Sequence, residues 1–575
     1  MIININTQER TFEINIDQYQ PVHSYIKIVC PKDNPKYTIL CMNEQAMTVE
    51  EYVELRRQTA NMAINEYLLT LLQTGLKYVV FTSPILIIEH ENGGIKDIKK
   101  RNVFIEIEKM LKRGELAPHA AEVADDQTDV PLLLQHLFEQ ARGIFIGQLL
   151  HDDTSIYIPV DRLPVHLSIV GTTGSGKTNL MQVMVHGVVD HNLEVIYSGL
   201  ANTPRVAILA IDPHDDYTMG TEGRGLYHLA DLLDPVVRKE IFGSYYYLYP
   251  GGTKPPAHLS SVSLECTINW EEISPDDLLN VKKFNPNQAE VLFSEASAAP
   301  GKWIENILYD TMKSAGHHAE TVPAVRRRLR SFERSKLFLK ASKKPSVLPE
   351  IVDLLESGKV LDFNCSLIND FEMFLFNTVV ASIIFEIRKA LKASTNMAEF
   401  KAQLQDRLPD AFWDKYKTKL DKYIRTGDDL KDPKEMPVVM FTIEEAPSIL
   451  NPEMMEGQNI FKDIARQGRK FNICLAVISQ QMSTLDNAII SNINTHINLP
   501  VGSDKERRSL VDNAANSITV NDLKALEGTL GVSQLDGNWL TKSQKILVPR
   551  YKEFFEKRKL VYSKYKPHGT SMPLI

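Results

Sequence analysis

Residues 167–178 read LSIVGTTGSGKT, and this stretch decides the fold. The short apolar run Leu167 to Val170 passes directly into a glycine-rich loop, and the segment Asn179 to Val185 that follows predicts a helix. From Gly171 to Thr178 the loop fits the pattern G-x-x-x-x-G-K-[ST] at every fixed position. Glycines let backbone N–H groups converge on phosphate oxygens, and a helix N-terminus adds partial positive charge. The sequence therefore predicts a phosphate-binding loop at a strand-to-helix junction.

The loop chemistry assigns separate roles to its residues. Lys177 is expected to reach the β- and γ-phosphates, and Thr178 to give its hydroxyl to Mg²⁺, so the expected cofactors are ATP and Mg²⁺. An ordinary glycine-rich turn before a helix is the alternative. The residues assigned to nucleotide binding are Gly171, Thr172, Thr173, Gly174, Ser175, Gly176, Lys177, Thr178 and Asn179.

Two later apolar runs end in polar side chains. Val438 to Ile443 is followed by Glu444 and Glu445, and Ile473 to Ile478 is followed closely by Gln480. In an open α/β sheet, ligands lie at the carboxyl ends of the strands. We expect Glu444 to join the Mg²⁺ shell, Glu445 to polarise the attacking water, and Gln480 to sense the γ-phosphate. The alternative for Glu444 and Glu445 is a solvated carboxylate pair just past a strand end, and the alternative for Gln480 is an amide that caps the structure.

Asp212 and two arginines complete the predicted site. Asp212 follows the apolar run Val206 to Ile211 and is expected to join the Mg²⁺ and water network. Arg466 and Arg469 belong to the charged segment 464–470, which is either a solvated helix end or the source of an arginine that crosses a subunit boundary. Such an arginine stabilises charge on a neighbour's γ-phosphate and is worth roughly 10³ to 10⁵ in rate, but it requires an oligomer.

The apolar runs also predict the architecture. Because those starting at Leu167, Val206, Val438 and Ile473 are nearly continuous, they indicate parallel strands covered on both faces by helices. Shorter alternating runs before residue 165 indicate a β-rich domain containing helical segments, one of them Val49 to Leu72. The predicted division is an N-terminal β-rich, barrel-like domain over 1–165, an α/β core over 166–270 and 351–550, helical insertions over 271–350 and 391–434, and a C-terminal arm over 551–575.

Composition limits the class of protein. The 575 residues exceed one core, and 43% hydrophobic content is that of globular proteins. The five cysteines include no C-x-x-C pair, which argues against disulfides and thiolate zinc sites. Phe371 to Ile387 is the nearest approach to a membrane span, but its charges indicate a core helix. We therefore expect a cytoplasmic protein that makes no membrane contact.

These motifs together resemble the HerA family of hexameric DNA-translocating ATPases, which is related to the FtsK-type motors. The resemblance rests on GTTGSGKT, on Asp212-Pro213-His214 with Tyr217 nearby, on Glu444-Glu445-Ala446, and on the run from Ile464 to Phe471 that leads to Ser479-Gln480. It covers about residues 142 to 550. Asp215 stands where the family commonly has glycine, and Pro447 where it often has histidine.

The resemblance implies a RecA-like ATPase core, a ring of six subunits with nucleotide at the subunit boundaries, and double-stranded DNA through the central pore. It also implies that Glu445 is catalytic, that Gln480 is the sensor and that Arg466 is the better trans-acting candidate. Family members work with an effector, such as a NurA-type nuclease or a sirtuin-like NAD-consuming protein. The long helical insertions favour a bacterial anti-phage system.

Two rival functions and one charged segment stay open. A net charge of −8 favours a nucleotide-gated scaffold ring that regulates an effector without moving DNA, and a small-molecule kinase is a distant third. The densest basic segment lies at 326–344, where we favour a solvated helix over a phosphate-binding surface.

Overall fold

The computed structural model describes residues 2–6, 10–31, 34–60, 75–100, 102–117, 120–124, 126–137, 143–152, 154–198, 203–220, 225–228, 244–318, 320–456 and 459–562. The chain forms two compact units. The first comprises Met1–Ala141, Gly147–Tyr157 and Val532–Leu547, and the second comprises Arg142–Ile146, Ile158–Gly531 and Val548–Ile575.

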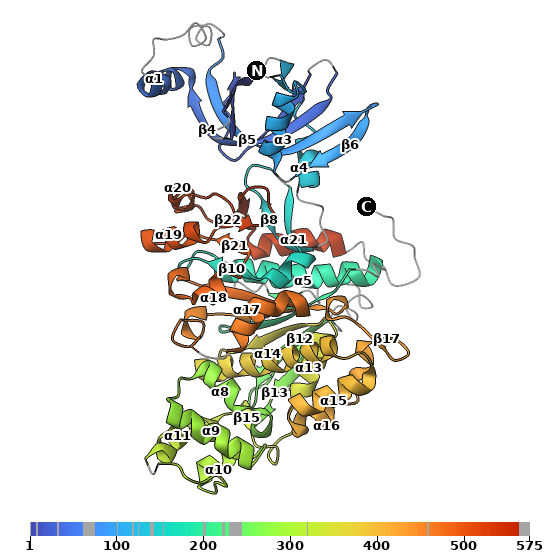
Figure 1. Ribbon diagram of the computed structural model, residues 1–575, viewed down its shortest axis with the longest axis vertical. Coiled ribbons are helices and arrows are strands. Elements are labelled where there is room, and N and C mark those ends of the chain that lie inside the picture. The colour runs from blue at the N-terminus through green and yellow to red at the C-terminus, as the bar shows by residue number, and fades with distance from the viewer. Residues whose placement is uncertain are drawn as a thin grey trace. The chain divides into compact units, whose positions relative to one another are not determined.

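A parallel sheet forms the centre of the second unit (Figure 1). All seven pairings between its neighbouring strands are parallel, and the predicted strands β10, β11, β19 and β20 are buried along their whole length. The predicted parallel core is therefore confirmed. The strands in spatial order are β13 (Ser263–Cys266), β12 (Tyr245–Pro250), β16 (Val360–Asn364), β11 (Val206–Asp212), β19 (Val438–Ile443), β20 (Ile473–Ser479), β10 (Leu167–Val170) and β21 (Thr495–Asn498).

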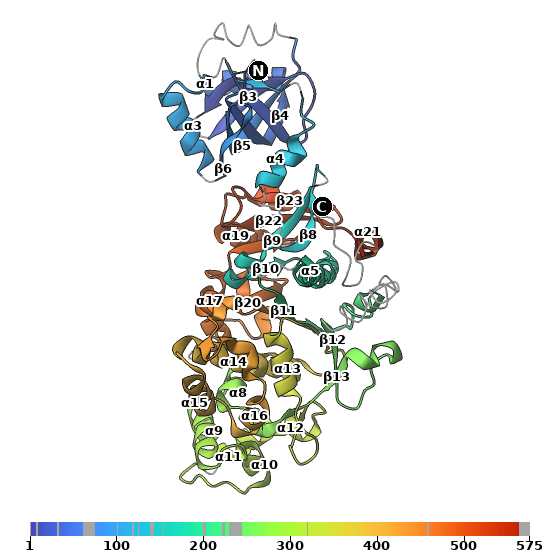
Figure 2. The same ribbon diagram turned by 90° about the vertical axis from the view of Figure 1, so that its right-hand side faces the viewer.

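Helices cover both faces of this sheet. The crossover from β10 to β11 through α5 (Lys177–Ser198) runs across the sheet in one direction, and that from β19 to β20 through α17 (Ile460–Phe471) runs in the other. Because parallel crossovers are right-handed, the two helices lie on opposite faces (Figure 2). The predicted core helix is confirmed as α14 (Asp370–Ala393), whose buried Asn377 donates to the Thr442 carbonyl at 2.8 Å.

Both predicted insertions are mainly helical. Between β14 (Ile268–Asn269) and β15 (Phe338–Leu339) the described residues form five α-helices and one short 3₁₀ helix, and the second insertion contains a small hairpin that the sequence did not suggest. Strands of two or three residues are too short to show alternation, which explains the omission. The helices are α8 (Pro275–Val281), α9 (Pro286–Ala298), α10 (Trp303–Tyr309), α11 (Thr321–Leu329) and α12 (Ser331–Arg334), then α15 (Met397–Arg407) and α16 (Asp410–Tyr416), with the hairpin β17 (Ile424–Thr426) and β18 (Asp429–Leu430).

An antiparallel sheet organises the first unit. The expected β-rich domain is confirmed; in the described residues β1 and β7 end the row of strands and do not pair with each other, so this sheet is open. Helix α1 covers the start of the predicted helix Val49 to Leu72, of which residues 61–72 lie outside the described residues. The strand order is β1 (Ile2–Asn6), β2 (Thr11–Ile16), β5 (Tyr78–Glu91), β4 (Tyr37–Thr48), β3 (Tyr25–Cys30) and β7 (Glu122–Val123), with β6 (Gly94–Lys99) on β5; the helices are α1 (Val49–Ala60), α3 (Val103–Lys112) and α4 (Val130–Leu137).

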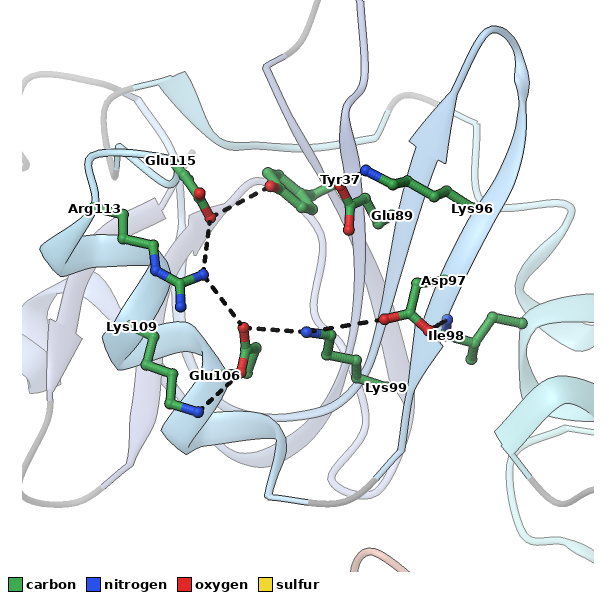
Figure 3. Close-up of polar contacts among 10 residues, drawn as sticks. All are labelled: Tyr37, Glu89, Lys96, Asp97, Ile98, Lys99, Glu106, Lys109, Arg113 and Glu115. Atoms are coloured by element: carbon green, nitrogen blue, oxygen red, sulfur yellow. Dashed lines mark hydrogen bonds and ion pairs between the residues drawn. The ribbon is translucent and has the colours of Figure 1, made fainter.

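Helix α3 joins this sheet through an apolar face and a charged edge. Phe104, Ile107 and Met110 are buried in the sheet's core. At the edge, Glu106 forms ion pairs with Lys99 at 3.1 Å and with Lys109 at 3.4 Å (Figure 3). Exposed pairs of this kind contribute only about 0–1 kcal/mol each, so the apolar face holds the helix.

Residues from the end of the chain change the expected domain boundary. Strand β23 (Gln544–Leu547) pairs antiparallel with both β22 (Val532–Gly537) and β8 (Gly143–Leu149), which in turn neighbours β9 (Ser155–Pro159). We expected residues 532–547 in the core and all of 1–165 in one domain. Pairing over about 400 residues depends on the tertiary structure, and no local pattern indicates it.

The start of the expected C-terminal arm is a packed helix, α21 (Tyr551–Tyr562). Tyr551, Phe554 and Phe555 are buried at spacings of three and four, which places them on one helical face. Residues 563–575 lie outside the described residues. In the described part of the chain, no helix combines the length and the apolar character that a membrane span requires.

Candidate functional site

A cavity of about 1380 Å³ lies at the carboxyl ends of β10, β11, β16, β19 and β20. It brings together the phosphate loop, the acidic pair and the predicted sensor, which are more than 300 residues apart at the extremes. Its lining includes Thr173, Gly174, Gly176, Lys177, Thr178, Asn179, Asp212, Tyr217, Glu444, Glu445, Gln480, Arg550 and Tyr551.

The phosphate loop is shaped by its glycines. Gly174 and Gly176 have φ of 75° and 103°, values that favour glycine. A Cβ on Gly171 would lie 2.4 Å from Ser175 Oγ and 2.8 Å from Leu499 Cβ, so the chain leaves no room for a side chain there. Thr172 anchors the loop by donating its backbone N–H to the Pro500 carbonyl at 3.0 Å.

Lys177 lies at the centre of the loop. Its Nζ donates to the carbonyls of Gly171 at 2.8 Å and Thr172 at 3.0 Å. Burial lowers the pKa of Lys177, and the carboxylates of Glu444 and Glu445 oppose that shift. Burial thus disfavours the charged form of Lys177, and the two nearby carboxylates favour it.

Glu444 is a partly buried carboxyl at the end of β19. Burial raises its pKa from 4.5 to about 7, against the opposing effects of the Tyr217 hydroxyl and Lys177. Tyr217, 2% exposed, donates its hydroxyl to Glu444 Oε1 at 2.6 Å. The family resemblance included Tyr217, but no role was predicted for it, because the local sequence pattern does not indicate where a tyrosine hydroxyl points.

Glu445 and Gln480 form a bridge to the phosphate loop. Gln480 donates its side-chain amide to Glu445 Oε1 at 3.4 Å and accepts the Thr173 hydroxyl on Oε1 at 3.1 Å. Glu445 is exposed to the cavity and has φ of 48°. A non-glycine residue in this region stores roughly 1–3 kcal/mol of strain, and such residues cluster at functional sites.

Asp212 shapes the loop after β11. Its carboxylate accepts the backbone N–H groups of Tyr217 at 2.7 Å, Asp216 at 3.0 Å and His214 at 3.3 Å. Burial raises the pKa of Asp212, and these N–H groups oppose the shift. Asp215 has φ of 60°, a value that favours glycine. This explains physically why the resemblance leads one to expect glycine at this position.

Asn179 connects the phosphate loop to the last described helix. Its Nδ2 donates to the Pro549 carbonyl at 2.9 Å, and its Oδ1 accepts the Tyr551 backbone N–H at 2.8 Å. Arg550 and Glu553 also line the cavity and add charged groups to it. No residue of α21 was predicted to belong to the site. The helical spacing of its aromatic residues was the one sequence feature that could have indicated a packed helix there.

Arg466 and Arg469 do not line this cavity. Both are exposed on α17, and within the described residues neither side chain has a hydrogen bond or an ion pair. The opposite side of α17 is held by His166, whose Nδ1 accepts the Leu475 backbone N–H and whose Nε2 therefore donates to the Ala465 carbonyl, both at 3.0 Å. Burial lowers the pKa of His166 to about 4 and keeps the ring neutral.

The donor set suits a magnesium nucleotide. Thr178 places an exposed hydroxyl beside Lys177, and Glu444 faces the same cavity. Mg²⁺ in such sites takes one or two protein oxygens, with phosphate oxygens and waters completing its shell. In the described part of the chain, no group of three or more His, Cys, Asp or Glu side chains could hold a metal by itself.

The fold and the loop are those of a P-loop NTPase. Residues 144–397 match the family described as "Helicase HerA, central domain". The chain is also 24% identical over 447 residues to the DNA double-strand break repair helicase HerA of Pyrococcus furiosus, covering 74% of this chain and 73% of that protein. The central region of the chain is thus similar to HerA.

Solved structures show partial likeness. The plasmid coupling protein TrwB in complex with ADP and Mg²⁺ has 11% identity and a TM-score of 0.43, and the likeness covers 73% of this chain and 92% of TrwB. VirB4 of Thermoanaerobacter pseudethanolicus has 13% identity and a TM-score of 0.40, with 71% and 97% covered.

Proposed function

We propose that this protein is a Mg²⁺-dependent ATPase of the HerA type that couples hydrolysis to movement along double-stranded DNA. The observation that carries the proposal is the bridge Thr173–Gln480–Glu445 beside Lys177 and Glu444 in one cavity. A structural glycine-rich turn would not need a strained carboxylate and an amide linked to it. The similarity to a DNA repair helicase supports the DNA part.

Each side chain has a role in this proposal. Lys177 binds the β- and γ-phosphates, and Thr178 and Glu444 hold Mg²⁺, with Asp212 contributing through water while it anchors the loop. Glu445 orients the attacking water, because it is exposed in the cavity and lies next to the amide of Gln480. Gln480 senses the γ-phosphate, since it touches both the phosphate loop and Glu445.

The proposal extends to a ring, in which Arg466 or Arg469 reaches the nucleotide of a neighbouring subunit. Their exposure on α17 and their absence from the cavity of their own chain support this role. We further propose an effector partner, either a nuclease or a sirtuin-like NAD-consuming protein, in anti-phage defence. Co-purification with the product of a neighbouring gene tests this last part.

The central experiment is Glu445→Gln. Loss of the carboxylate should lower ATP turnover by roughly 10²- to 10⁴-fold and leave ATP binding unchanged. Phosphate release and binding of a fluorescent ATP analogue give the two measurements. Glu456→Gln, which changes an exposed carboxylate on the loop that follows, is the matched control. Turnover that persists in Glu445→Gln would contradict the assigned role.

A scaffold ring is the second candidate, and the net charge of −8 favours it. The two functions differ in their response to DNA. A translocase should hydrolyse ATP faster when duplex DNA is added, whereas a scaffold should hydrolyse it at the same rate.

A further inference from the structure

The basic segment of the first insertion separates into two kinds of arginine. Helices α11 and α12 form a nearly continuous helical run, because Arg330 between them has helical angles of φ −57° and ψ −21°. Val325, Leu329 and Phe332 are buried at spacings of four and three and form the inner face of this run.

Two arginines of the segment hold the insertion together. Arg326 donates to the Ile307 carbonyl at 2.7 Å and pairs with Asp310, which fastens α11 to α10. Arg328 donates to the Lys283 carbonyl and lies 5.1 Å from the ring centroid of Phe284. Both side chains therefore make contacts within the fold.

Three other arginines face solvent. Arg327, Arg330 and Arg334 are exposed and follow one another at spacings of three and four, so they form a row on the outer side of the run. Among the residues that the structure describes, none of the three side chains has a hydrogen bond or ion pair. The stretch from Thr321 to Arg334 contains a single acid, Glu333.

We propose that this arginine row, Arg327, Arg330 and Arg334, binds the phosphate backbone of DNA. The inference rests on the proposed function and adds a contact surface outside the nucleotide site. A helix rises about 1.5 Å per residue, so spacings of three and four place the Cα atoms of the row roughly every 5 Å along the helix, whereas the phosphates of one DNA strand follow one another about every 3.4 Å along the axis. The long arginine side chains can span this difference. Guanidinium groups bind phosphate in bidentate fashion, and such contacts read charge without reading sequence.

The overall charge strengthens this reading. The chain carries 65 basic and 73 acidic residues, so its surface as a whole repels a polyanion. A local row of cations without acidic partners costs stability through mutual repulsion, and a phosphate backbone removes that cost. An acidic protein surface would do so too, and the experiment below separates the two partners.

The test compares the full-length protein with the triple variant R327Q/R330Q/R334Q. Binding of a short random-sequence DNA duplex is measured by fluorescence anisotropy over a range of salt concentrations. If three phosphate contacts disappear, the slope of log K against log salt becomes shallower by about 2.7, and the wild type loses about 40-fold more affinity than the variant between about 50 and 200 mM salt.

The control is the triple variant K401Q/K417Q/K434Q, which removes the same charge from exposed positions outside this insertion. Its salt slope should match that of the wild type. Because the three arginines make no described contact within the fold and repel one another, R327Q/R330Q/R334Q should melt at the wild-type temperature or above it, and should keep the wild-type ATP turnover without DNA.

Three results would count against the arginine row as a DNA contact, and a fourth would contradict the proposed function. An unchanged slope in R327Q/R330Q/R334Q overturns the inference. If the wild type binds polyglutamate, and the arginine variant loses this binding but keeps its DNA binding, the row belongs to an acidic protein partner. An equal change in both triple variants assigns the effect to net charge and also overturns it. Failure of the wild type to bind DNA contradicts the proposed function itself.

Discussion

Glu445 and Asp215 are two non-glycine residues with positive φ close to the nucleotide cavity. Each follows a buried strand within three residues, at the edge where the chain turns sharply. Asp215 is held by the Tyr247 hydroxyl, which donates to its carboxylate at 3.1 and 3.2 Å. The identities of these residues were readable in the sequence, but their strained backbone depends on the turns that the packed strands impose.

Burial raises the pKa of Glu444 and the hydroxyl of Tyr217 opposes that shift, so the pair predicts a pH dependence. Because the pKa of Glu444 is about 7, its ionised form, which the proposed contact with Mg²⁺ needs, declines as the pH falls through that value. Tyr217→Phe removes a hydrogen bond that favours the carboxylate, so the pKa rises further, by about 1 unit for a bond to a charged group.

The measurement is the Mg²⁺ concentration at half-maximal ATP turnover, recorded from pH 6 to 9. It should increase on lowering the pH, and in Tyr217→Phe the increase should begin at higher pH. Tyr246→Phe on β12 is the control and should follow the wild type. A Tyr217→Phe profile identical to the wild type would contradict the role of the hydroxyl.

Gly171 predicts a steric requirement. Gly171→Ala places a Cβ against Ser175 Oγ and Leu499 Cβ, so the loop must shift and ATP affinity should fall by about tenfold, or 1.4 kcal/mol. Gly502→Ala is the matched control, because its Cβ would meet only Thr172 Cγ2 at an ordinary 3.5 Å. Calorimetric titration with ATP measures both, and equal affinities would refute the prediction.

At the scale of elements, helix α14 is tied to its neighbours by a buried ion pair. Arg388 and Glu356 are both buried, with Nε and Oε1 at 2.9 Å, and Arg388 also donates to the carbonyls of Pro433 and Pro437 at 3.0 and 3.1 Å. The pair joins α14 to α13 (Leu348–Glu356) and to the segment that enters β19.

Arg388→Ala should therefore destabilise the second unit strongly. It leaves Glu356 buried without its partner, a change that costs about 3–5 kcal/mol. Lys392→Ala on the same helix breaks a half-exposed pair with Asp432 and should cost about 0–1 kcal/mol. Denaturant unfolding followed by far-UV circular dichroism compares them, and equal midpoints for the two variants would count against a structural role for the buried pair.

Elements could be predicted from the sequence where the pattern was long. The four buried strands were found from nearly continuous apolar runs and the core helix from a long apolar stretch interrupted by charges, whereas β12, β13, β16 and β21 were not singled out. Tyr245 to Pro250, for example, is rich in tyrosine and forms β12 inside the sheet. Its burial comes from neighbours on both sides, which a local window does not contain.

At the scale of the whole molecule, the proposed ring predicts complementation between two inactive variants. Lys177→Ala removes the lysine proposed to bind phosphate, and Arg466→Ala removes the proposed trans-acting arginine. In a mixed ring, a subunit with Arg466→Ala keeps Lys177 and receives Arg466 from a Lys177→Ala neighbour, so some complete sites form again.

ATP turnover of the mixture should therefore exceed that of either variant alone. Mixing Lys177→Ala with Glu445→Gln is the control, because both residues are proposed to serve the same site in one subunit and no complete site can form. If the two mixtures have equal turnover, Arg466 does not act across a subunit boundary. Repeating the experiment with Arg469→Ala decides between the two arginines.

The sequence by itself determined the phosphate loop, the parallel strands around it and the kinds of side chain at their carboxyl ends, because those features are local and a strand buried on both faces leaves a continuous apolar pattern. Only the tertiary structure decided that Tyr217 holds Glu444, that Gln480 joins Thr173 to Glu445 and that α21 borders the cavity. It also separated Arg326 from Arg327 within one run of arginines. Such distinctions depend on contacts between residues far apart in the chain, and these contacts exist only once the chain is packed.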